Sequence, residues 1–438
     1  MRLDKLLVVR ELKKPHFLFA ALFLVGISGL AAWLTGANLL FEYHFYKARA
    51  ALSENRLDEA RYHAGHCLNL SPQSGRTHLL AAQVARRFGD VKAAERQLTE
   101  AQKLLHLSDD VALERSLLLA QRGEVDGVQS QLRPLIDRGH PQTVQILEAL
   151  AKGYLRVFRL EEAEKCLKEW LEHDPKSAEA NLLLGWSMQQ KGMAAESINY
   201  FRRSVELDPD NAVPHFQLAM ALIDNVQPDE AIDDLRYLAK VQPNNPTVLV
   251  SLARCEHALG EIEEARATLD EVLSNYPNNP GALIERGVLA NNTESPATAE
   301  VYLKKALEID PSNPQGNFNY HLCLIKQGKE KEAAEQQAKI RRIDQDLHDS
   351  ADLLTSRIPA MPDNPVVHYQ AGVILLRLGN DREAERMLFR ALKLDPGYVP
   401  AQNVLLEHFK KKGDFKQAAS LKEAIETGRP ITAAYPFN

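Results

Sequence analysis

The fold of this chain is decided by a stretch of 34 residues, Ala178–Asn211, which reads AEANLLLGWSMQQKGMAAESINYFRRSVELDPDN. Its apolar residues recur three and four positions apart, a spacing that predicts two short amphipathic helices. Gly192 separates the two helices, and Pro209 ends the second. Gly185 and Ser197 are small at the positions where the helices have to approach closely. Neither helix can bury its apolar stripe alone, so the stretch predicts a unit that stacks on neighbours of its own kind.

The same pattern recurs along the chain at a spacing of 34 residues, with one extra residue in one copy and a longer step near the C-terminus. Small residues recur at the positions of Gly185 and Ser197, and a proline closes most copies. Two copies are degenerate, because Pro134 falls inside a second helix and the copy 75–108 lacks the closing proline. The copies begin at Phe41, Gly75, Asp109, Val144, Ala178, Ala212, Pro246, Pro280, Pro314, Pro365 and Val399.

This repeat length and its small-residue and proline signature resemble the tetratricopeptide repeat (TPR) family over residues 41–428. The resemblance implies an all-α, right-handed superhelical solenoid of about eleven helix–turn–helix repeats. We expect a basic N-terminal segment (1–16), a transmembrane anchor (17–41) and repeats 1–9 (42–347). An extended helix or linker insertion (348–364), repeats 10–11 (365–428) and a C-terminal tail (429–438) should follow.

Composition narrows the classes of function. The chain has 53 Lys and Arg against 59 Asp and Glu, a net charge of −6, which argues against non-specific binding of nucleic acid. Its four cysteines stand in four different repeats, and no CxxC motif occurs. Neither a zinc site nor a disulfide framework is therefore supported.

The N-terminal segment predicts a membrane anchor. Residues 17–41 carry no charge, and as a helix they are long enough to span a bilayer. A cleaved signal peptide ending near Ala37 is the alternative, but this apolar run is longer than usual, and the first repeat begins where it ends. Five basic residues precede the run, which favours an inside N-terminus and periplasmic repeats, with a cytoplasmic orientation left open. Ser28, Ala32 and Gly36 form a small-residue ladder that would permit a weak homodimer through the anchor.

One interruption breaks the register between the copies that begin at Pro314 and Pro365. Residues 329–358 contain neither Gly nor Pro, which predicts one extended helix, or two abutting ones, closed by Pro359 and Pro362. This helix could be a hinge or a docking arm; a longer second helix that covers the edge of a groove is the favoured interpretation. An extended helix followed by final repeats also resembles bacterial, membrane-anchored TPR proteins. The predicted inward face carries Ala333, Gln337, Ile340, Leu347, Ala351 and Leu354.

The turns have regular chemistry. Asn245, Asn279, Asn313 and Asn364 each precede a proline, which predicts an N-cap followed by Pro in the first helical turn. Acidic pairs such as Glu263-Glu264 recur at the start of second helices, where the helix dipole favours negative charge. We therefore interpret these pairs as capping residues and not as catalytic carboxylates.

Motifs of catalysis are absent from the sequence. It contains no GxxxxGK[ST], HExxH, GxSxG or GxGxxG. His63, His66 and Cys67 could form part of a metal site, but Cys67 falls in a core position and no further ligand is evident. We expect no enzyme activity, no cofactor and no metal.

With no catalytic or metal site indicated, the candidate functional site is a binding surface. In the TPR family the first helices of successive repeats line a groove that binds peptides or other proteins. A subset of the family holds a peptide C-terminal carboxylate with Lys and Asn residues; here those places are mainly apolar, so that clamp is not carried over. The resemblance places these residues on the groove: Leu182, Trp186, Phe216, Met220, Ile223, Val250, Arg254, His257, Ile284, Val288, Phe318, Leu322 and Ile325.

The sequence therefore predicts a non-catalytic scaffold or adaptor at a membrane, with a protein or peptide partner. Two alternatives stay open. One is a periplasmic chaperone or transport receptor for unfolded chains, and the other is an accessory subunit of a complex for envelope polymer synthesis or export.

Overall fold

The structure is a computed structural model that describes residues 38–106 and 108–427. Within these ranges every regular element is a helix. The described residues form two compact units, which meet in the sequence between Pro209 and Asp210. We call them the N-terminal unit and the C-terminal unit and describe each by itself.

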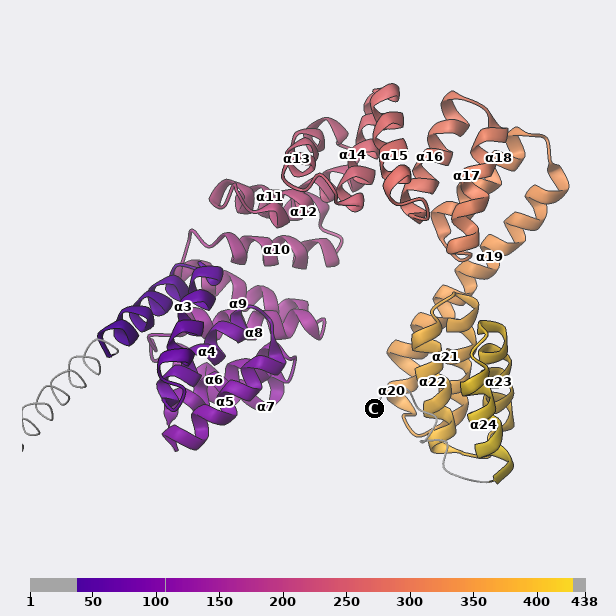
Figure 1. The fold of residues 1–438 in the computed structure, drawn as a ribbon. Coiled ribbons are helices and arrows are strands. Elements are labelled where there is room, and N and C mark those ends of the chain that lie inside the picture. The colour runs from indigo at the N-terminus through magenta and orange to yellow at the C-terminus, as the bar shows by residue number, and fades with distance from the viewer. Residues whose placement is uncertain (1–37, 107, 428–438) are drawn as a thin grey trace, which may run out of the picture. The chain divides into compact units, whose positions relative to one another are not determined.

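The N-terminal unit is built from helix pairs that follow one another along the chain (Figure 1). Residues 38–53 form the first helix, and α3 (Leu57–Leu70) pairs with it. The later pairs are α4 (Gly75–Arg87) with α5 (Val91–Leu105), α6 (Asp109–Gln121) with α7 (Val125–Asp137), α8 (Thr143–Arg156) with α9 (Leu160–His173), and α10 (Ala178–Gln190) with α11 (Ala194–Leu207).

The C-terminal unit continues the same pattern and adds one long helix. Its pairs are α12 (Ala212–Asp224) with α13 (Pro228–Val241), α14 (Pro246–Leu259) with α15 (Ile262–Asn275), α16 (Pro280–Thr293) with α17 (Pro296–Ile309), α18 (Pro314–Lys326) with α19 (Glu330–Asp352), α21 (Pro365–Arg377) with α22 (Asp381–Leu394), and α23 (Val399–Lys412) with α24 (Phe415–Thr427). A π-helical turn (Leu353–Arg357) and the short α20 (Ile358–Ala360) follow α19.

The predicted register is confirmed. Nine of the eleven predicted repeat starts open a described helix at the same residue; α8 begins one residue before Val144, and the first helix is described from residue 38. The small positions mark close helix contacts, as expected: a Cβ on Gly185 would lie 2.5 Å from Cδ1 of Phe201, and one on Gly287 would lie 2.7 Å from Cγ of Leu303. Any larger side chain would force the paired helices apart.

The predicted asparagine caps are also confirmed. The side chain of Asn279 accepts a hydrogen bond from the backbone N–H of Ala282, and that of Asn313 accepts one from Gly316. Asn245 and Asn364 cap α14 and α21 in the same way. Each helix therefore begins where its cap and proline fix the backbone.

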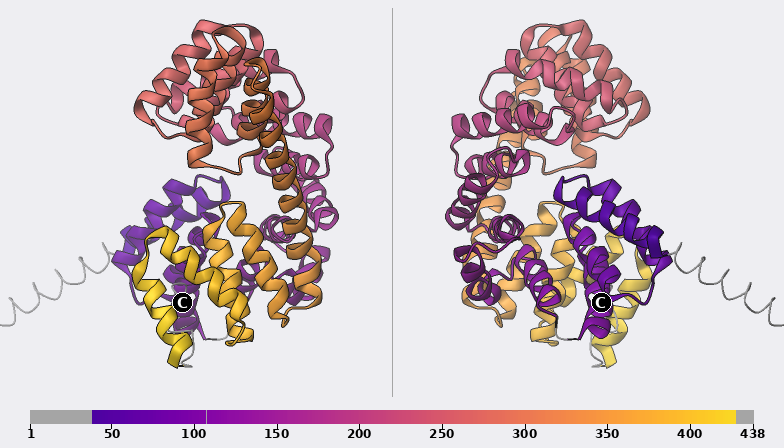
Figure 2. Two further views of the ribbon diagram at one scale, coloured as in Figure 1. Left: turned by 90° about the vertical axis from the view of Figure 1, so that its right-hand side faces the viewer. Right: turned by 90° about the vertical axis from the view of Figure 1, so that its left-hand side faces the viewer.

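The long helix α19 forms as predicted (Figure 2). Its buried face includes Ala333, as predicted, but otherwise differs from the predicted one. Leu347 and Ala351 are exposed, whereas Gln336, Asp346 and Ser350 are buried. Polar partners select this face: Gln336 donates to Asn317 Oδ1 at 2.7 Å on α18, and Asp346 accepts from Arg377 Nε at 2.9 Å on α21. Apolar spacing could not reveal a face that is held by hydrogen bonds. The helix continues through Pro359, which occupies the first turn of α20, and ends before Pro362.

The predicted anchor (17–41), its small-residue ladder, the basic segment and the C-terminal tail lie wholly or mainly outside the described residues. No helix within residues 38–106 and 108–427 is both long and apolar enough to cross a membrane.

Candidate functional site

The candidate groove residues recur at fixed places on the first helices. Phe216, Met220 and Ile223 stand four, eight and eleven residues after the repeat start at Ala212, and the other candidates follow the same rule. Leu182 and Trp186 belong to α10 of the N-terminal unit. The remaining candidates lie on α12, α14, α16 and α18 of the C-terminal unit, and we call them the apolar face.

The apolar face is open to solvent at α18. Phe318 is 53% exposed and Ile325 is 54% exposed, while Leu322 between them is half-buried. Exposed side chains of this size on one helix face mark a surface that a partner can cover.

Phe216 on α12 lines a cavity of about 370 Å³ between α12 and the start of α14. Val213, Gln217 and Thr247 contribute to its walls. Phe216 and its neighbour Met220 are half-buried, so each packs within the repeat and still reaches the surface.

One predicted groove residue is not on the surface. Ile284 is only 3% exposed and belongs to a core cluster with Leu283 and Ala306. It fills space left by Gly316 in the next repeat, where a Cβ would lie 3.3 Å from Ile284 Cδ1. Val250 and Val288 are half-buried and also pack against core residues. Part of the predicted groove is therefore packing between repeats.

Arg254 and His257 form a polar interruption on α14. Arg254 Nη2 lies 3.7 Å from Asp224 Oδ1, and Nε and Nη2 are buried without a hydrogen-bond partner among the described residues. Burial lowers the pKa of His257, which favours its neutral form. The middle of the apolar face thus offers a hydrogen-bond donor.

In the N-terminal unit, Trp186 packs partly against the core and faces Phe158, with ring centroids 6.4 Å apart. Phe158 stands in the turn between α8 and α9 and is 69% exposed. Leu182 on the same helix is half-buried.

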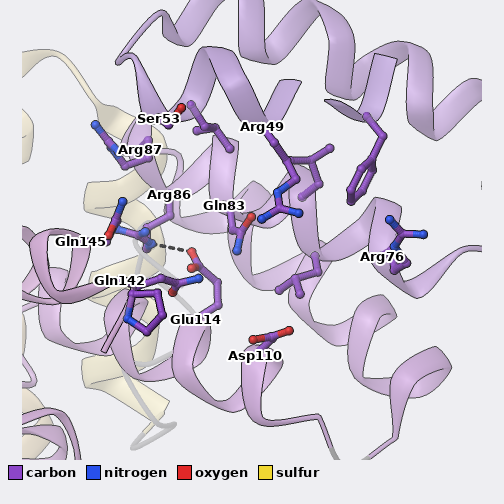
Figure 3. A pocket seen from close by; sticks show the side chains of 15 residues that line it. Arg49, Ser53, Arg76, Gln83, Arg86, Arg87, Asp110, Glu114, Gln142 and Gln145 are labelled. Atoms are coloured by element: carbon purple, nitrogen blue, oxygen red, sulfur yellow. Dashed lines mark hydrogen bonds and ion pairs between the residues drawn. The ribbon is translucent and has the colours of Figure 1, made fainter. Parts of the chain in front are cut away.

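The same unit contains a pocket that the sequence reasoning missed (Figure 3). Its volume is about 440 Å³, and it is lined by the first three first helices, the two residues before α8 and Gln145 within α8. We call it the arginine pocket. Its lining combines apolar side chains with these polar ones: Arg49, Ser53, Arg76, Gln83, Arg86, Arg87, Asp110, Glu114, Gln142 and Gln145.

Buried ion pairs hold two of the arginines that line the arginine pocket. Arg86 Nε lies 2.5 Å from Glu114 Oε1, and both side chains are almost wholly buried. Beside them, Glu148 Oε1 lies 3.2 Å from Arg87 Nε and 2.8 Å from Lys152 Nζ. Because charges leave water only when they are paired, this network fixes the guanidinium groups in place.

The network also shifts the pKa values of the side chains that form it. Burial raises the pKa of Glu114, and Arg86 offsets the rise only in part. Burial alone would raise the pKa of Glu148 too, but Lys152, Arg87 and Arg86 outweigh it and leave that pKa lowered. Burial acts against the charge of Arg86, yet Glu114 and Glu148 outweigh it and raise its pKa.

A sequence signal for this pocket existed. Phe45, Arg49 and Leu52 stand four, eight and eleven residues after Phe41, and Gln83 and Arg86 stand eight and eleven after Gly75. These are the groove positions that identified the apolar face. In the first two repeats several of these positions carry polar or charged side chains, which a pattern of apolar residues does not reveal.

The histidines near the N-terminus are closer together than the sequence indicated. His44 joins His63 and His66, with His44 Nδ1 2.7 Å from His63 Nδ1 and the rings of His44 and His66 stacked at 4.4 Å. Cys67 is fully buried, as predicted. Within the described part of the chain, no group of three or more His, Cys, Asp or Glu side chains has an arrangement that could hold a metal ion.

Comparison with known families agrees with this architecture. Two family models described as tetratricopeptide repeat match the chain, one over residues 148–212 and 258–314 and the other over residues 225–283. None of the curated proteins matches the sequence.

Several solved structures match the chain at low sequence identity. PilW, titled a widely conserved type IV pilus biogenesis factor, is 20% identical, covers 46% of this chain and 93% of its own, and has a TM-score of 0.40. MamA from Desulfovibrio magneticus RS-1 is 18% identical over 39% of this chain and 96% of its own, with a TM-score of 0.37. The Cut9–Hcn1 structure is 15% identical over 84% of this chain and 83% of its own, with a TM-score of 0.37.

The matched segments overlap helix pairs on both sides of the boundary at Pro209. The chain therefore carries tetratricopeptide repeats in both of its units.

Proposed function

We propose that this chain is a non-catalytic protein–protein interaction scaffold, tethered to a membrane, that binds a partner on the first-helix face of its repeats. TPR repeats commonly serve as interaction scaffolds, and the matched repeat families support that role here. The observation that carries the proposal is the exposure of Phe318 and Ile325 on one face of α18.

The partner surface is an amphipathic helix or an extended apolar segment. Trp186, Phe216, Met220 and Phe318 are the proposed anchors, because large side chains in partly enclosed sites contribute most of the binding energy at interfaces. Each is half-buried or exposed, so each can gain contacts when a partner covers it.

The tether is the uncharged run 17–41, and the proposed location is the bacterial inner membrane with the repeats in the periplasm. Protease added to intact spheroplasts should then degrade the repeats. Full protection of the repeats in spheroplasts, with digestion after lysis, would place them in the cytoplasm.

Partner binding is tested by crosslinked capture with the detergent-solubilised full chain. One stoichiometric partner is expected, and the double variant Phe318→Ser/Ile325→Ser should reduce its capture at least about tenfold, equivalent to ~1.4 kcal/mol. A matched control is Phe415→Ser/Val301→Ser, because Phe415 and Val301 are exposed on second helices of the same unit. Capture of many unfolded clients would instead favour the chaperone alternative, and an assembled synthase would favour the accessory subunit.

A further inference from the structure

Arg86 has hydrogen-bonding capacity that the fold does not use. The residue is 3% exposed, and its Nε is occupied by Glu114. Its Nη1 is buried, and no described residue accepts a hydrogen bond from it. Buried polar groups normally have partners, so an orphaned donor on the wall of a pocket needs an explanation. Figure 3 shows the Arg86 guanidinium held against Glu114 within the pocket lining.

Arg49 is a second cation that lines the same pocket. Arg49 is exposed and makes no hydrogen bond or ion pair with any described residue. The other two arginines of the lining have partners, since Arg76 lies 3.5 Å from Glu42 and Arg87 lies 3.2 Å from Glu148. Because Arg86 is paired with Glu114 as well, Arg49 is the arginine of this lining without a carboxylate partner among the described residues.

The lining also limits the kind of anion that the arginine pocket can bind. Arg76, Arg86 and Arg87 already have carboxylate partners, so Arg49 is left to balance a ligand, and one such cation matches the single charge of a carboxylate better than the double charge of a phosphate. The net charge of −6 on the chain further disfavours a polyanion. Phe45, Leu79 and Leu80 add apolar wall, which suits the side chains that flank an acidic residue in a peptide.

We propose that the arginine pocket binds an aspartate or glutamate side chain within an otherwise apolar, extended segment of a partner protein. Arg86 Nη1 and Arg49 donate hydrogen bonds to that carboxylate, and such charge-assisted bonds are the strong ones. This inference rests on the proposed scaffold function, because it assigns the chemistry of one part of the partner. It requires an internal acidic side chain and no free peptide C-terminus.

The test is a selection of random peptides displayed on phage, fused at their C-termini so that no terminal carboxylate is free. The bait is the full chain in detergent. Peptides selected on the wild-type chain should be enriched in Asp or Glu flanked by apolar residues. A synthetic copy of a selected peptide should bind at least tenfold more tightly than its version with Gln or Asn at the acidic position.

Arg49→Gln is the principal variant, because Arg49 is exposed and its loss leaves no buried charge unpaired. It should abolish both the enrichment and the tenfold preference, and Arg86→Gln/Glu114→Gln should do the same with both partners neutral. Arg96→Gln, an exposed position on α5 outside the pocket, is the matched control and should change neither. Melting midpoints of all variants separate loss of binding from loss of fold.

Three results would overturn the inference: selected peptides without acidic enrichment, enrichment that survives Arg49→Gln, or displacement of the peptide by millimolar inorganic phosphate, which would indicate a phosphate site. Repeating the selection on Phe318→Ser/Ile325→Ser distinguishes the two proposals. If peptides without acidic enrichment are selected and depend on Phe318 and Ile325, this inference fails while the scaffold proposal stands. If no form of the chain selects any peptide, both fail.

Discussion

The arginine pocket and the apolar face use the same register positions on first helices but differ in chemistry at the eighth residue after the repeat start. There the arginine pocket has Arg49 and Gln83, whereas the apolar face has Met220 on α12 and Leu322 on α18. The small residues that set helix contact are alike in both units. Stacking therefore constrains the positions between helices and leaves the first-helix face free to differ from repeat to repeat.

The two regions also differ in what stabilises them. The arginine pocket depends on charges that lost their water and must stay paired. The apolar face exposes large side chains at Phe318 and Ile325 that add little to the fold until something covers them. Substitution of the buried pair Arg86–Glu114 should accordingly lower the stability of the fold, whereas substitution of Phe318 and Ile325 should lower binding.

The largest effect is expected for Arg86→Ala. Removing the arginine leaves Glu114 buried without its partner, which should cost ~3–5 kcal/mol of unfolding free energy in the N-terminal unit. Denaturant unfolding followed by hydrogen exchange on α4 and α6 measures it. The double change Arg86→Met/Glu114→Leu should restore most of the loss, since no charge is then stranded. A loss below ~1 kcal/mol for the single variant would mean that the pair is not desolvated as the structure has it.

A smaller loss is expected for Ala265→Trp in the C-terminal unit. Ala265 is fully buried at the small position of α15, so the larger side chain overpacks the contact and should destabilise the unit by ~1–3 kcal/mol. Ala334→Trp on α19 is the control, because Ala334 is exposed. An unchanged denaturant midpoint for Ala265→Trp would show that the contact is elsewhere.

Trp186→Ala and Phe216→Ala ask whether half-buried groove residues serve binding or packing. As anchors, they should reduce partner capture at least about tenfold, or ~1.4 kcal/mol, with little change in the melting midpoint. As core residues, they should instead lose several kcal/mol of stability, about 3–5 for such truncations, with capture falling only as the protein unfolds. Ile284→Ala is the reference for the core outcome, since Ile284 is buried.

The sequence was sufficient to predict features that depend on local chemistry. Gly185 and its equivalents marked close contacts, and the Asn-Pro pairs marked helix starts, because small size and capping act over a few residues. The buried face of α19 was predicted only in part: Ala333 is buried, but Leu347 and Ala351 are exposed. Gln336 and Asp346 are buried instead, because they have polar partners that apolar spacing does not reveal.

The candidate site was predictable only in part. Ile284 was predicted to lie on the surface because it stands four residues after a repeat start, as Phe216 and Phe318 do. It is buried instead, because Gly316 has no Cβ and leaves space for the Ile284 side chain. The Arg86–Glu114 pair joins residues 28 apart on different repeats, and nothing in a single sequence shows which charges meet. The register position of Arg86 was visible, whereas its partner and its free Nη1 required the structure.

Acid should distinguish the two units further, beginning with Glu300 in the C-terminal unit. Hydrogen bonds from Lys304 and Lys329 hold the pKa of Glu300 down at about 2. A carboxylate with a lowered pKa stabilises the fold fully above its unfolded value near 4.5 and loses that contribution as pH falls toward 2. Because both lysines are partly exposed, we expect only ~1 kcal/mol, measured as the difference between Glu300→Gln and wild type at pH 6. The difference should vanish near pH 2, and a difference that persists there would assign it to packing.

The smallest effect should come at milder acidity from the first helix pair of the N-terminal unit. Burial lowers the pKa of His44 and His63, and the neighbouring His66 lowers both further. A histidine with a lowered pKa contributes stability that is present above its unfolded value of 6.5 and is lost as pH falls below it, because the unfolded chain then binds protons more readily. Glu59, with Oε1 3.9 Å from His63 Nε2, offsets only part of this loss. Amide hydrogen exchange in residues 38–53 and α3 should therefore accelerate between pH 7 and pH 5, after correction for the intrinsic rate, while exchange around Glu300 stays unchanged. His44→Gln/His63→Gln should remove this pH dependence, and wild-type exchange that does not change across the interval would show that the histidine cluster is already open to solvent.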